Sequence, residues 1–166
     1  MSVTVRQAIP DDYPDIARIT VAAYLASGHF DAESPYLRFI ADVAERHQHA
    51  DVWVAEVAGA VVGSVTLVRR GSRYADIALD GELEFRMLAV DPGVQRTGAG
   101  RALVRAIVAH ARALEGVHAV SLTTGEVWGV PRRLYASEGF AHTRKRDWLV
   151  PGTDIRLVVY VLDLDD

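Results

Sequence analysis

The sequence predicts an α/β (α+β) fold in which helices flank a mixed, mostly antiparallel sheet. Two β-rich runs, residues 51–57 and 61–68, are joined by Ala58-Gly59-Ala60, which indicates a β-hairpin. A strand-like run over 83–90 then leads through a glycine-rich turn into an apolar helical stripe over 98–114. A hairpin followed by alternating strands and helices is typical of a mixed sheet with helices on its faces.

The remaining elements complete a β-α-α-β-β-β-α-β-α-β order. Residues 3–8 alternate as a first strand, and Asp12 is placed to cap a helix that runs to Ala23. We further expect a helical region over 27–50, a loop over 69–81, a strand over 119–122, a helix over 131–137 ended by Gly139, a strand over 155–164 and one more strand around 140–145. The chain has no repeat, low-complexity tract or linker, so residues 1–166 are expected to form a single domain.

Composition excludes several classes of protein. The 166 residues are half apolar and about a quarter charged, as in an ordinary globular domain, and the net charge of −4 argues against a general nucleic-acid binder. The absence of cysteine removes disulfides, thiolate metal sites and a cysteine nucleophile, and no metal is expected. The N-terminus lacks the apolar core of a signal peptide, and the longest apolar stretch, 52–68, is too broken to span a bilayer. We therefore expect a cytoplasmic protein.

The stretch VDPGVQRTGAGRALV, residues 90–104, has the glycine content of a phosphate-binding turn. Residues 93–98 have the spacing of a Walker A loop, but Ala99 and Gly100 stand where its lysine and its serine or threonine should be. A dinucleotide fingerprint requires a third glycine where this chain has Leu103. Both readings are therefore poor.

A third pattern, Q-x-x-G-x-G, fits Gln95 to Gly100. Small side chains let the backbone N–H groups close on an anion, and the start of the following helix adds roughly half a positive charge. Arg96 and Arg101 can add full charges, which suits a pyrophosphate that needs no metal. The turn alone is equally compatible with a plain glycine-rich connection between a strand and a helix.

The surroundings of the turn decide between these readings. The segment E-F-R-M-L-A-V-x-P-x-x-Q-x-x-G-x-G-x-x-L-V, residues 84–104, resembles the acetyl-CoA-binding motif of the GCN5-related N-acetyltransferases (GNAT). A second stretch, L-Y-x-x-x-G-F at 134–140, resembles the later motif of that family. The order of the motifs and of the expected elements also matches, so the resemblance covers essentially the whole chain. It implies a GNAT-like domain whose central sheet contains two strands that splay apart.

The resemblance implies where acetyl-CoA binds. Main-chain groups of the strand segment Leu88, Ala89 and Val90 would receive the pantetheine arm, and the Leu88 N–H would polarise the thioester carbonyl. The amides of the turn would hold the pyrophosphate; these residues are Gln95, Arg96, Thr97, Gly98, Ala99, Gly100 and Arg101.

Two further residues match catalytic positions of the family. Tyr135 matches the tyrosine that protonates the departing CoA thiolate and lies beside the cofactor. Glu84 matches the glutamate that some branches use as general base, whereas many members move the amine proton through water. Both have structural alternatives, because the Tyr135 ring can pack under the sheet and Glu84 can be an exposed strand carboxylate paired with Arg86 or Arg69.

Other candidates carry weaker signals. Trp128 occupies a position where many members have an asparagine that touches the cofactor, and both Trp128 and Trp148 fit either an acceptor-site wall or the core. Arg144-Lys145-Arg146 is either a solvated edge or a receptor for the 3′-phosphate of CoA. Three histidines lie in the region where the family builds its acceptor site, although surface or packing roles are commoner for such residues: His29, His47 and His49.

The expected activity is acetyl-CoA-dependent transfer of an acetyl group to a primary amine. Direct transfer in a ternary complex is expected, because there is no cysteine to form an acyl-enzyme. A small-molecule amine is the default acceptor, with a protein or peptide amine or an aminoacyl-tRNA left open. The alternative is a sensor or structural module that binds acyl-CoA without catalysis. A homodimer is compatible with the family.

Overall fold

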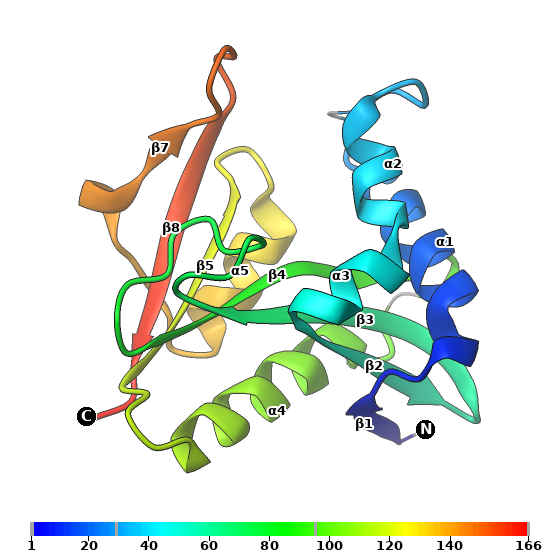
Figure 1. Ribbon diagram of the computed structural model, residues 1–166, viewed down its shortest axis with the longest axis horizontal. Helices are drawn as coiled ribbons and strands as arrows, with labels where there is room; N and C mark the ends of the chain where they lie inside the picture. Colours follow the sequence, from blue (N-terminus) through cyan, green and yellow to red (C-terminus); the bar gives the residue numbers. More distant parts are fainter. Residues whose placement is uncertain (1, 29, 95, 166) are drawn as a thin grey trace.

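The computed structural model describes residues 2–28, 30–94 and 96–165, in which eight strands form one sheet (Figure 1). The strand order is β1-β2-β3-β4-β5-β8-β6, and β7 pairs with β8. The strands are β1 (Val3–Gln7), β2 (Asp51–Val57), β3 (Ala60–Arg69), β4 (Glu82–Val90), β5 (Ala119–Gly125), β6 (Ala141–His142), β7 (Trp148–Leu149) and β8 (Arg156–Asp163). The helices are α1 (Tyr13–Ala26), α2 (Pro35–Ala41), α3 (Val43–His49), α4 (Ala99–Ala113) and α5 (Gly129–Ser137), with short 3₁₀ turns η1 (Pro10–Asp12), η2 (Pro92–Val94) and η3 (Arg144–Arg146).

The sheet changes direction at one place only among the described strands. β4 and β5 are parallel, and every other neighbouring pair is antiparallel. The parallel pairing begins at Glu82↔Ala119 and ends at Phe85↔Leu122, although β4 continues to Val90 and β5 to Gly125. The two strands therefore splay apart beyond Phe85, and the predicted mixed sheet is confirmed.

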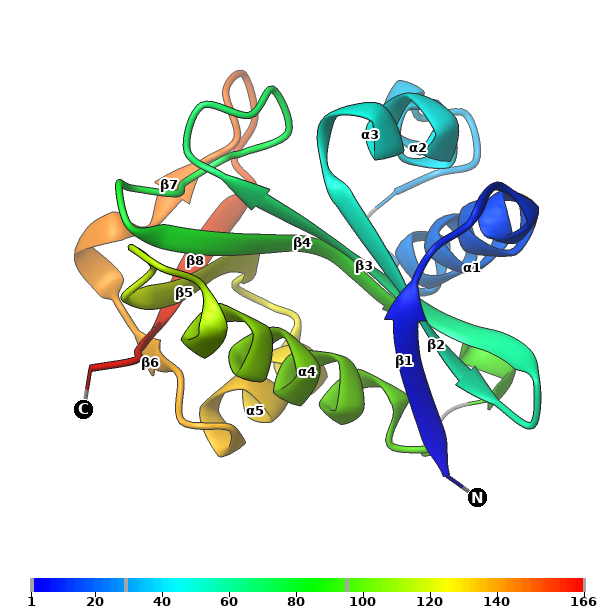
Figure 2. The same ribbon diagram turned by 60° about the horizontal axis from the view of Figure 1, so that its bottom comes forward.

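Helices cover both faces of the sheet. Figure 2 shows α1, α2 and α3 on one side, with α4 and α5 on the other. The alternation along β2 explains both layers: Val52 and Val54 belong to the core that contains Ile16 of α1, whereas Trp53 belongs to the core that contains Leu103 of α4. Because successive side chains of a strand point to opposite faces, one β-strand serves two hydrophobic cores.

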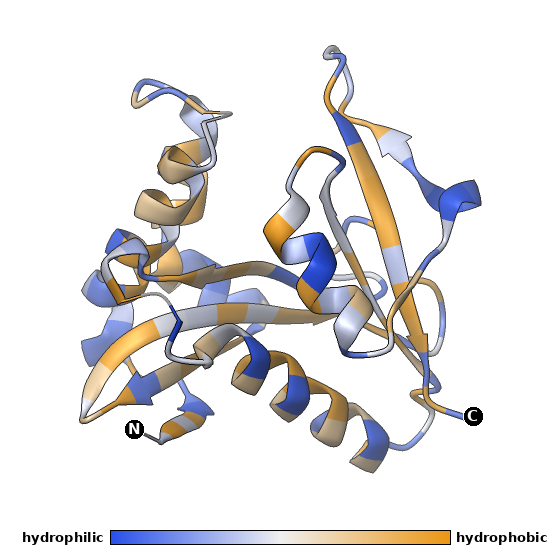
Figure 3. Cartoon of the chain, turned by 180° about the vertical axis from the view of Figure 1, so that it is seen from behind, coloured by the Kyte–Doolittle hydropathy of each residue, from blue (hydrophilic) through white to orange (hydrophobic). Residues whose placement is uncertain are grey.

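The predicted apolar stripe forms only part of the inner face of α4. Its members Ala99, Leu103 and Ile107 are buried, but Ala113 is exposed. Val104 and Ala111, which the predicted stripe did not include, complete the buried face, and Arg105 on the opposite face is exposed. In Figure 3 the α4 ribbon accordingly alternates between hydrophobic and hydrophilic bands. Burying each large side chain contributes about 1.5–3 kcal/mol, so this face anchors the helix under the sheet. None of the helices within the described ranges is long and apolar enough to cross a membrane.

Several boundaries differ from the sequence prediction. The helical region expected over 27–50 is two short helices, because the backbone of Asp42 leaves the helical conformation (φ −82°, ψ 74°). The Asp42 side chain then caps α3 by accepting a hydrogen bond from the Glu45 N–H at 3.3 Å. The strand expected around 140–145 shortens to β6 and gives way to η3, and β7 was not predicted.

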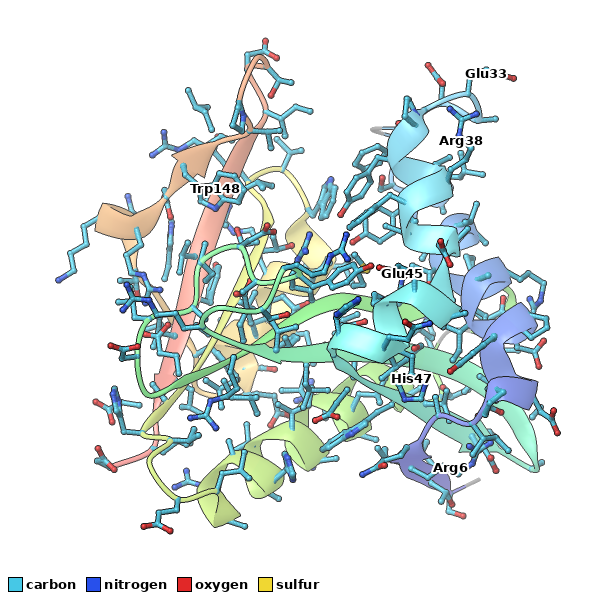
Figure 4. All side chains as sticks on the ribbon, in the orientation of Figure 1. Arg6, Glu33, Arg38, Glu45, His47 and Trp148 are labelled. Carbon is cyan, nitrogen blue, oxygen red and sulfur yellow. The ribbon has the colours of Figure 1, made fainter. Side chains whose placement is uncertain are left out.

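The helix cap predicted at Asp12 is wrong. The Asp12 carboxylate makes no cap to α1 and instead accepts the Ile9 N–H at 2.8 Å. It also pairs at 2.8 Å with the guanidinium of Arg6 in β1 (labelled in Figure 4), and Arg6 contacts Glu56 as well. Asp12 thus ties the end of β1 to the start of α1.

We expect this link to make stability sensitive to acid. The hydrogen bond from Arg6 holds the pKa of Asp12 below its ordinary value, so its contribution is present above pH 4 and is lost as pH falls through the lowered pKa. Asp12→Asn should therefore lower the free energy of unfolding near neutral pH by no more than about 1 kcal/mol, with a corresponding drop in melting temperature. Between pH 5 and pH 2 the melting temperature of this variant should fall less steeply than that of the native protein. Asp11→Asn at the exposed neighbour is the control, and an equal flattening there would contradict the assignment.

Candidate active site

A cleft of about 930 Å³ opens where β4 and β5 part. Its walls come from α1, β4, the turn before α4, β5 and α5. Glu84 is not among its lining residues, and Gln95 lies outside the described residues. All other predicted site residues line it: Leu88, Ala89, Val90, Arg96, Thr97, Gly98, Ala99, Gly100, Arg101 and Tyr135.

The free edge of β4 faces this cleft. The Asp91 N–H donates to the carbonyl of Val62 in β3 at 2.8 Å. Since successive residues of a strand direct their main-chain groups to opposite edges, Val90 and Leu88 direct theirs away from β3, toward the gap left by β5. No β5 residue pairs with them, because the β4–β5 register ends earlier. The main-chain groups of both residues are therefore available to a ligand.

A β-bulge sets this orientation. Ser64 pairs with Ala89 and Thr66 with Arg86, so one residue of β3 stands opposite two of β4. Met87, one of those two, has a left-handed backbone (φ 55°), which a side chain other than glycine rarely adopts. Bulges re-aim the strand beyond them, and here the change occurs immediately before Leu88.

The predicted phosphate turn ends in the N-terminus of α4. Gly98 has φ 82° and precedes the first helical residue, a conformation that favours glycine. The Ala99 N–H donates to the Thr97 hydroxyl at 3.3 Å, and the first N–H bonded back into the helix is that of Ala102, to Gly98 O at 2.9 Å. The amides of the first turn thus lack helical acceptors and face the cleft, which makes this end suitable for an anion.

The two arginines of the turn differ in their partners. Arg101 pairs with Glu138 of the chain after α5 and donates to Ser137 at 3.2 Å. Arg105 also contacts Glu138, and these arginines hold the pKa of its carboxyl below the ordinary value. Arg96 has a left-handed backbone (φ 68°) and lines the cleft. Part of the charge of Arg101 is therefore balanced within the protein.

Tyr135 reaches the cleft from α5 while its ring stays in the core. The residue is 5% exposed, and the ring meets Phe85 edge-on at 5.7 Å between centroids. Burial raises the pKa of its hydroxyl well above the ordinary value, so the hydroxyl keeps its proton at neutral pH. The packing and proton-donor interpretations of Tyr135 are thus compatible, because the ring packs and the residue lines the cleft.

The structural alternative for Glu84, an exposed strand carboxylate, is wrong. Its side chain is fully buried, and its Oε1 accepts hydrogen bonds from the backbone N–H groups of Asp76, Ile77 and Ala78 at 3.0–3.1 Å. Burial raises the pKa of the Glu84 carboxyl, and these hydrogen bonds oppose that rise. Neither Arg86 nor Arg69 forms an ion pair with it. The carboxylate holds the 69–81 loop against β4.

The cleft residues that sequence reasoning missed include Tyr24, Arg86 and Thr123. A signal existed for Tyr24, because it lies four residues after Thr20 and eight after Ile16, on the buried face of α1. A signal existed for Arg86 as well, since it is a lone cation inside an apolar strand. For Thr123 the sequence carries no comparable signal.

Most of the weaker candidates lie away from the cleft. His47 bonds the Tyr13 hydroxyl through Nδ1 at 2.6 Å, and His49 contacts Glu45 at 3.2 Å, while His29 is outside the described residues. Trp128 lines the cleft. Trp148 (labelled in Figure 4) does not line it, but its indole N–H donates to the hydroxyl of Thr123, which is a lining residue. In the part of the chain that is described, no group of three acidic, histidine or cysteine residues is placed to hold a metal.

The basic run 144–146 is also remote from the cleft. Arg146 pairs with Glu82 at 2.9 Å and donates to the Ile77 carbonyl at 2.8 Å. None of the three residues lines the cleft, so a 3′-phosphate role has no support in their position.

Comparisons with known proteins agree with this geometry. The family described as "Acetyltransferase (GNAT) domain" matches residues 48–142, more than half of the chain. YncA of Salmonella typhimurium, solved with its cofactor acetyl-CoA, is 23% identical and superposes with a TM-score of 0.73 over 100% of this chain and 96% of that one. The ribosomal-protein-S18-alanine N-acetyltransferase of Escherichia coli gives 19% identity, a TM-score of 0.70 and coverages of 98% and 94%.

A chimera of Vibrio cholerae spermidine N-acetyltransferase SpeG and hSSAT gives 17% identity and a TM-score of 0.72, over 99% of this chain and 97% of that one. At these identities the similarity concerns the fold. No curated protein sequence matches the chain significantly.

Proposed function

The chain belongs to the GNAT acetyltransferase family, and we propose that it transfers the acetyl group of acetyl-CoA directly to a primary amine. The observation that carries the proposal is the cleft itself. A free strand edge, an anion-binding helix end and a buried tyrosine line one cavity of about 930 Å³. A small-molecule amine is the acceptor we favour, and no residue supplies the thiol that an acyl-enzyme would need.

Two parts of the cleft, the start of α4 and the free edge of β4, would bind acetyl-CoA. The open amides at the start of α4 would hold the pyrophosphate, with Arg96 adding charge. The pantetheine arm would lie along β4 and hydrogen-bond the main chain of Val90 and Leu88. Such a path brings the thioester to the bulge and the Leu88 N–H to its carbonyl oxygen.

The chemical step then needs three kinds of assistance. The amine nitrogen attacks the thioester carbon, and the negative charge on oxygen is stabilised by the Leu88 N–H. As the intermediate collapses, the carbon–sulfur bond breaks and the sulfur takes a proton from the Tyr135 hydroxyl, which regains a proton from water before the next cycle. Holding amine and thioester side by side supplies much of the remaining rate.

The proton of the amine has two candidate routes, a water chain and Glu84. The three amide hydrogen bonds and full burial of the Glu84 carboxylate count against direct contact with an acceptor. We therefore propose that water removes the proton and that Glu84 positions the 69–81 loop.

Glu84→Gln tests this assignment, because an amide oxygen still accepts the three N–H groups but is not a base. We expect a folded protein whose kcat stays within about tenfold of the native value, short of the hundredfold or more that loss of a general base costs. Glu84→Leu leaves the three N–H groups buried without an acceptor and should lower the free energy of unfolding by at least about 2 kcal/mol. A hundredfold loss of kcat in a folded Glu84→Gln protein would make the carboxylate the base.

The proposed function itself is tested with the purified chain and acetyl-CoA. Calorimetry measures acetyl-CoA binding, and release of free thiol reports transfer to a panel of amines, with mass spectrometry of the product. Binding accompanied by thiol release is the expected result. Binding without transfer to any amine would favour the acyl-CoA sensor, and absence of binding would reject both functions.

A further inference from the structure

Arg86 places a cation in the cleft beyond the proposed position of the thioester. It stands two residues before Leu88 on β4, lines the cleft and has a side chain that is 12% exposed. A guanidinium has five N–H donors. Its Nη1 donates to the Tyr74 carbonyl at 2.7 Å, and its Nη2 contacts Asp76 at 3.0 Å and the Tyr36 hydroxyl at 3.4 Å. Among the described residues no group accepts a hydrogen bond from its Nε, so donors remain for a ligand.

Aromatic rings surround this end of the cleft. Tyr24 meets Tyr36 at 5.8 Å and Trp128 edge-on at 6.3 Å between ring centroids. Tyr24 and Trp128 belong to opposite walls, α1 and the start of α5, so their contact bridges the cavity. These rings lower the local dielectric constant beside Arg86, so a charge interaction is stronger there than in bulk solvent.

Two guanidiniums and two carboxylates lie around these rings. Arg46 of α3 is 1% exposed, donates to the Ile40 carbonyl at 2.6 Å and has no carboxylate partner in the described chain. Its burial lowers its pKa, and it interacts with Tyr36, Tyr74 and Arg86. The two carboxylates are Asp76, which contacts only Nη2 of Arg86, and Glu84, whose oxygen is already occupied by three amides.

We propose that Arg86 binds a carboxylate of the acceptor, which makes the acceptor an amino acid or a similar small molecule with an anionic group close to its amine. The inference rests on the proposed function and specifies its substrate class. Only Met87 separates Arg86 from Leu88 in the chain, so an anchor at Arg86 suits a carboxylate only a few bonds from the reacting nitrogen. A polyamine carries no anionic group that Arg86 could bind.

Direct binding tests the inference independently of turnover. With the protein saturated by CoA, calorimetry compares L-phenylalanine, L-leucine and L-methionine with their carboxamides, which keep the amine and the side chain. We expect at least one acid to bind roughly tenfold or more tightly than its amide, as a charge-assisted contact requires. Arg86→Gln should bring each acid and its amide within about twofold of each other, and Arg86→Lys should restore part of the preference.

Asp76→Asn distinguishes a ligand-binding role of Arg86 from a purely structural one. If Arg86 binds the ligand, removal of its competing carboxylate leaves acid binding unchanged or tighter; if the Arg86–Asp76 pair only braces the loop, both variants lose binding alike. The inference is overturned by that second result, by acids and amides that bind equally, or by acids that do not bind. Failure of the proposed function looks different: the preference for acids persists, but no thiol is released from acetyl-CoA with any amine.

Discussion

Replacing Tyr135 with phenylalanine is expected to lower kcat by about a hundredfold or more, the usual range for loss of a general acid. The dissociation constant for acetyl-CoA should stay within about threefold, because the ring and its packing remain. The ring contacts Phe85, Phe140 and Tyr160 in the core, and none of these contacts uses the hydroxyl. The melting temperature is therefore expected to be unchanged.

The pH dependence sharpens this expectation. Burial holds the pKa of the Tyr135 hydroxyl above its ordinary value of about 10, so the native residue is protonated throughout an assay between pH 6 and pH 9.5. The rate of the native protein should not fall on the alkaline side through loss of this proton. The phenylalanine variant should show a parallel profile at a lower level.

Tyr160→Phe is the matched control for this experiment. Its ring lies 6.2 Å from that of Tyr135, its hydroxyl accepts a hydrogen bond from Arg132 at 3.1 Å, and it does not line the cleft. Removing that hydroxyl should leave kcat within about threefold. Equal losses in the two variants, or a kcat for Tyr135→Phe within threefold of native, would remove the acid role from Tyr135.

The parts of the site that sequence could predict are those built from neighbouring residues. The turn from Arg96 to Arg101 and the stripe on α4 are local patterns, since glycine, helix start and apolar period all fall within a few residues. The sequence also predicted the hairpin at Ala58-Gly59, where both residues have positive φ (52° and 80°). Such signals survive in any tertiary context.

What escaped prediction depends on distant partners. Glu84 is held by amides of residues 76–78, and the sequence of that loop contains no pattern which predicts that these N–H groups converge on a carboxylate. The break at Asp42 is set by the packing of two short helices on different cores, and a periodic pattern continues through it. The pairing of Arg86 with Asp76 likewise joins a strand to a loop. In each case the side chain was visible in the sequence, but the groups that it meets were not.

Gly100→Glu is expected to weaken acetyl-CoA binding by at least about a hundredfold. Gly100 lines the cleft in the first turn of α4, where the open amides face the proposed pyrophosphate. A Cβ there would lie 3.4 Å from Leu134 and 3.6 Å from Val90, which are tolerable contacts. Like charges about 4 Å apart repel by roughly 4 kcal/mol at an effective dielectric constant near 20, which exceeds a hundredfold in affinity.

The same substitution should not harm folding, and this makes the test decisive. A carboxylate in the first turn of a helix interacts favourably with its dipole, so the melting temperature should hold or rise while the anion site is filled by the protein itself. Gly100→Gln adds similar bulk without charge and should cost much less affinity. Ala109→Glu places the same charge at an exposed position of α4, away from the cleft, and should leave the dissociation constant unchanged. If Gly100→Glu binds acetyl-CoA as the native protein does, the pyrophosphate lies elsewhere, because a carboxylate and a diphosphate cannot share the end of one helix at no cost.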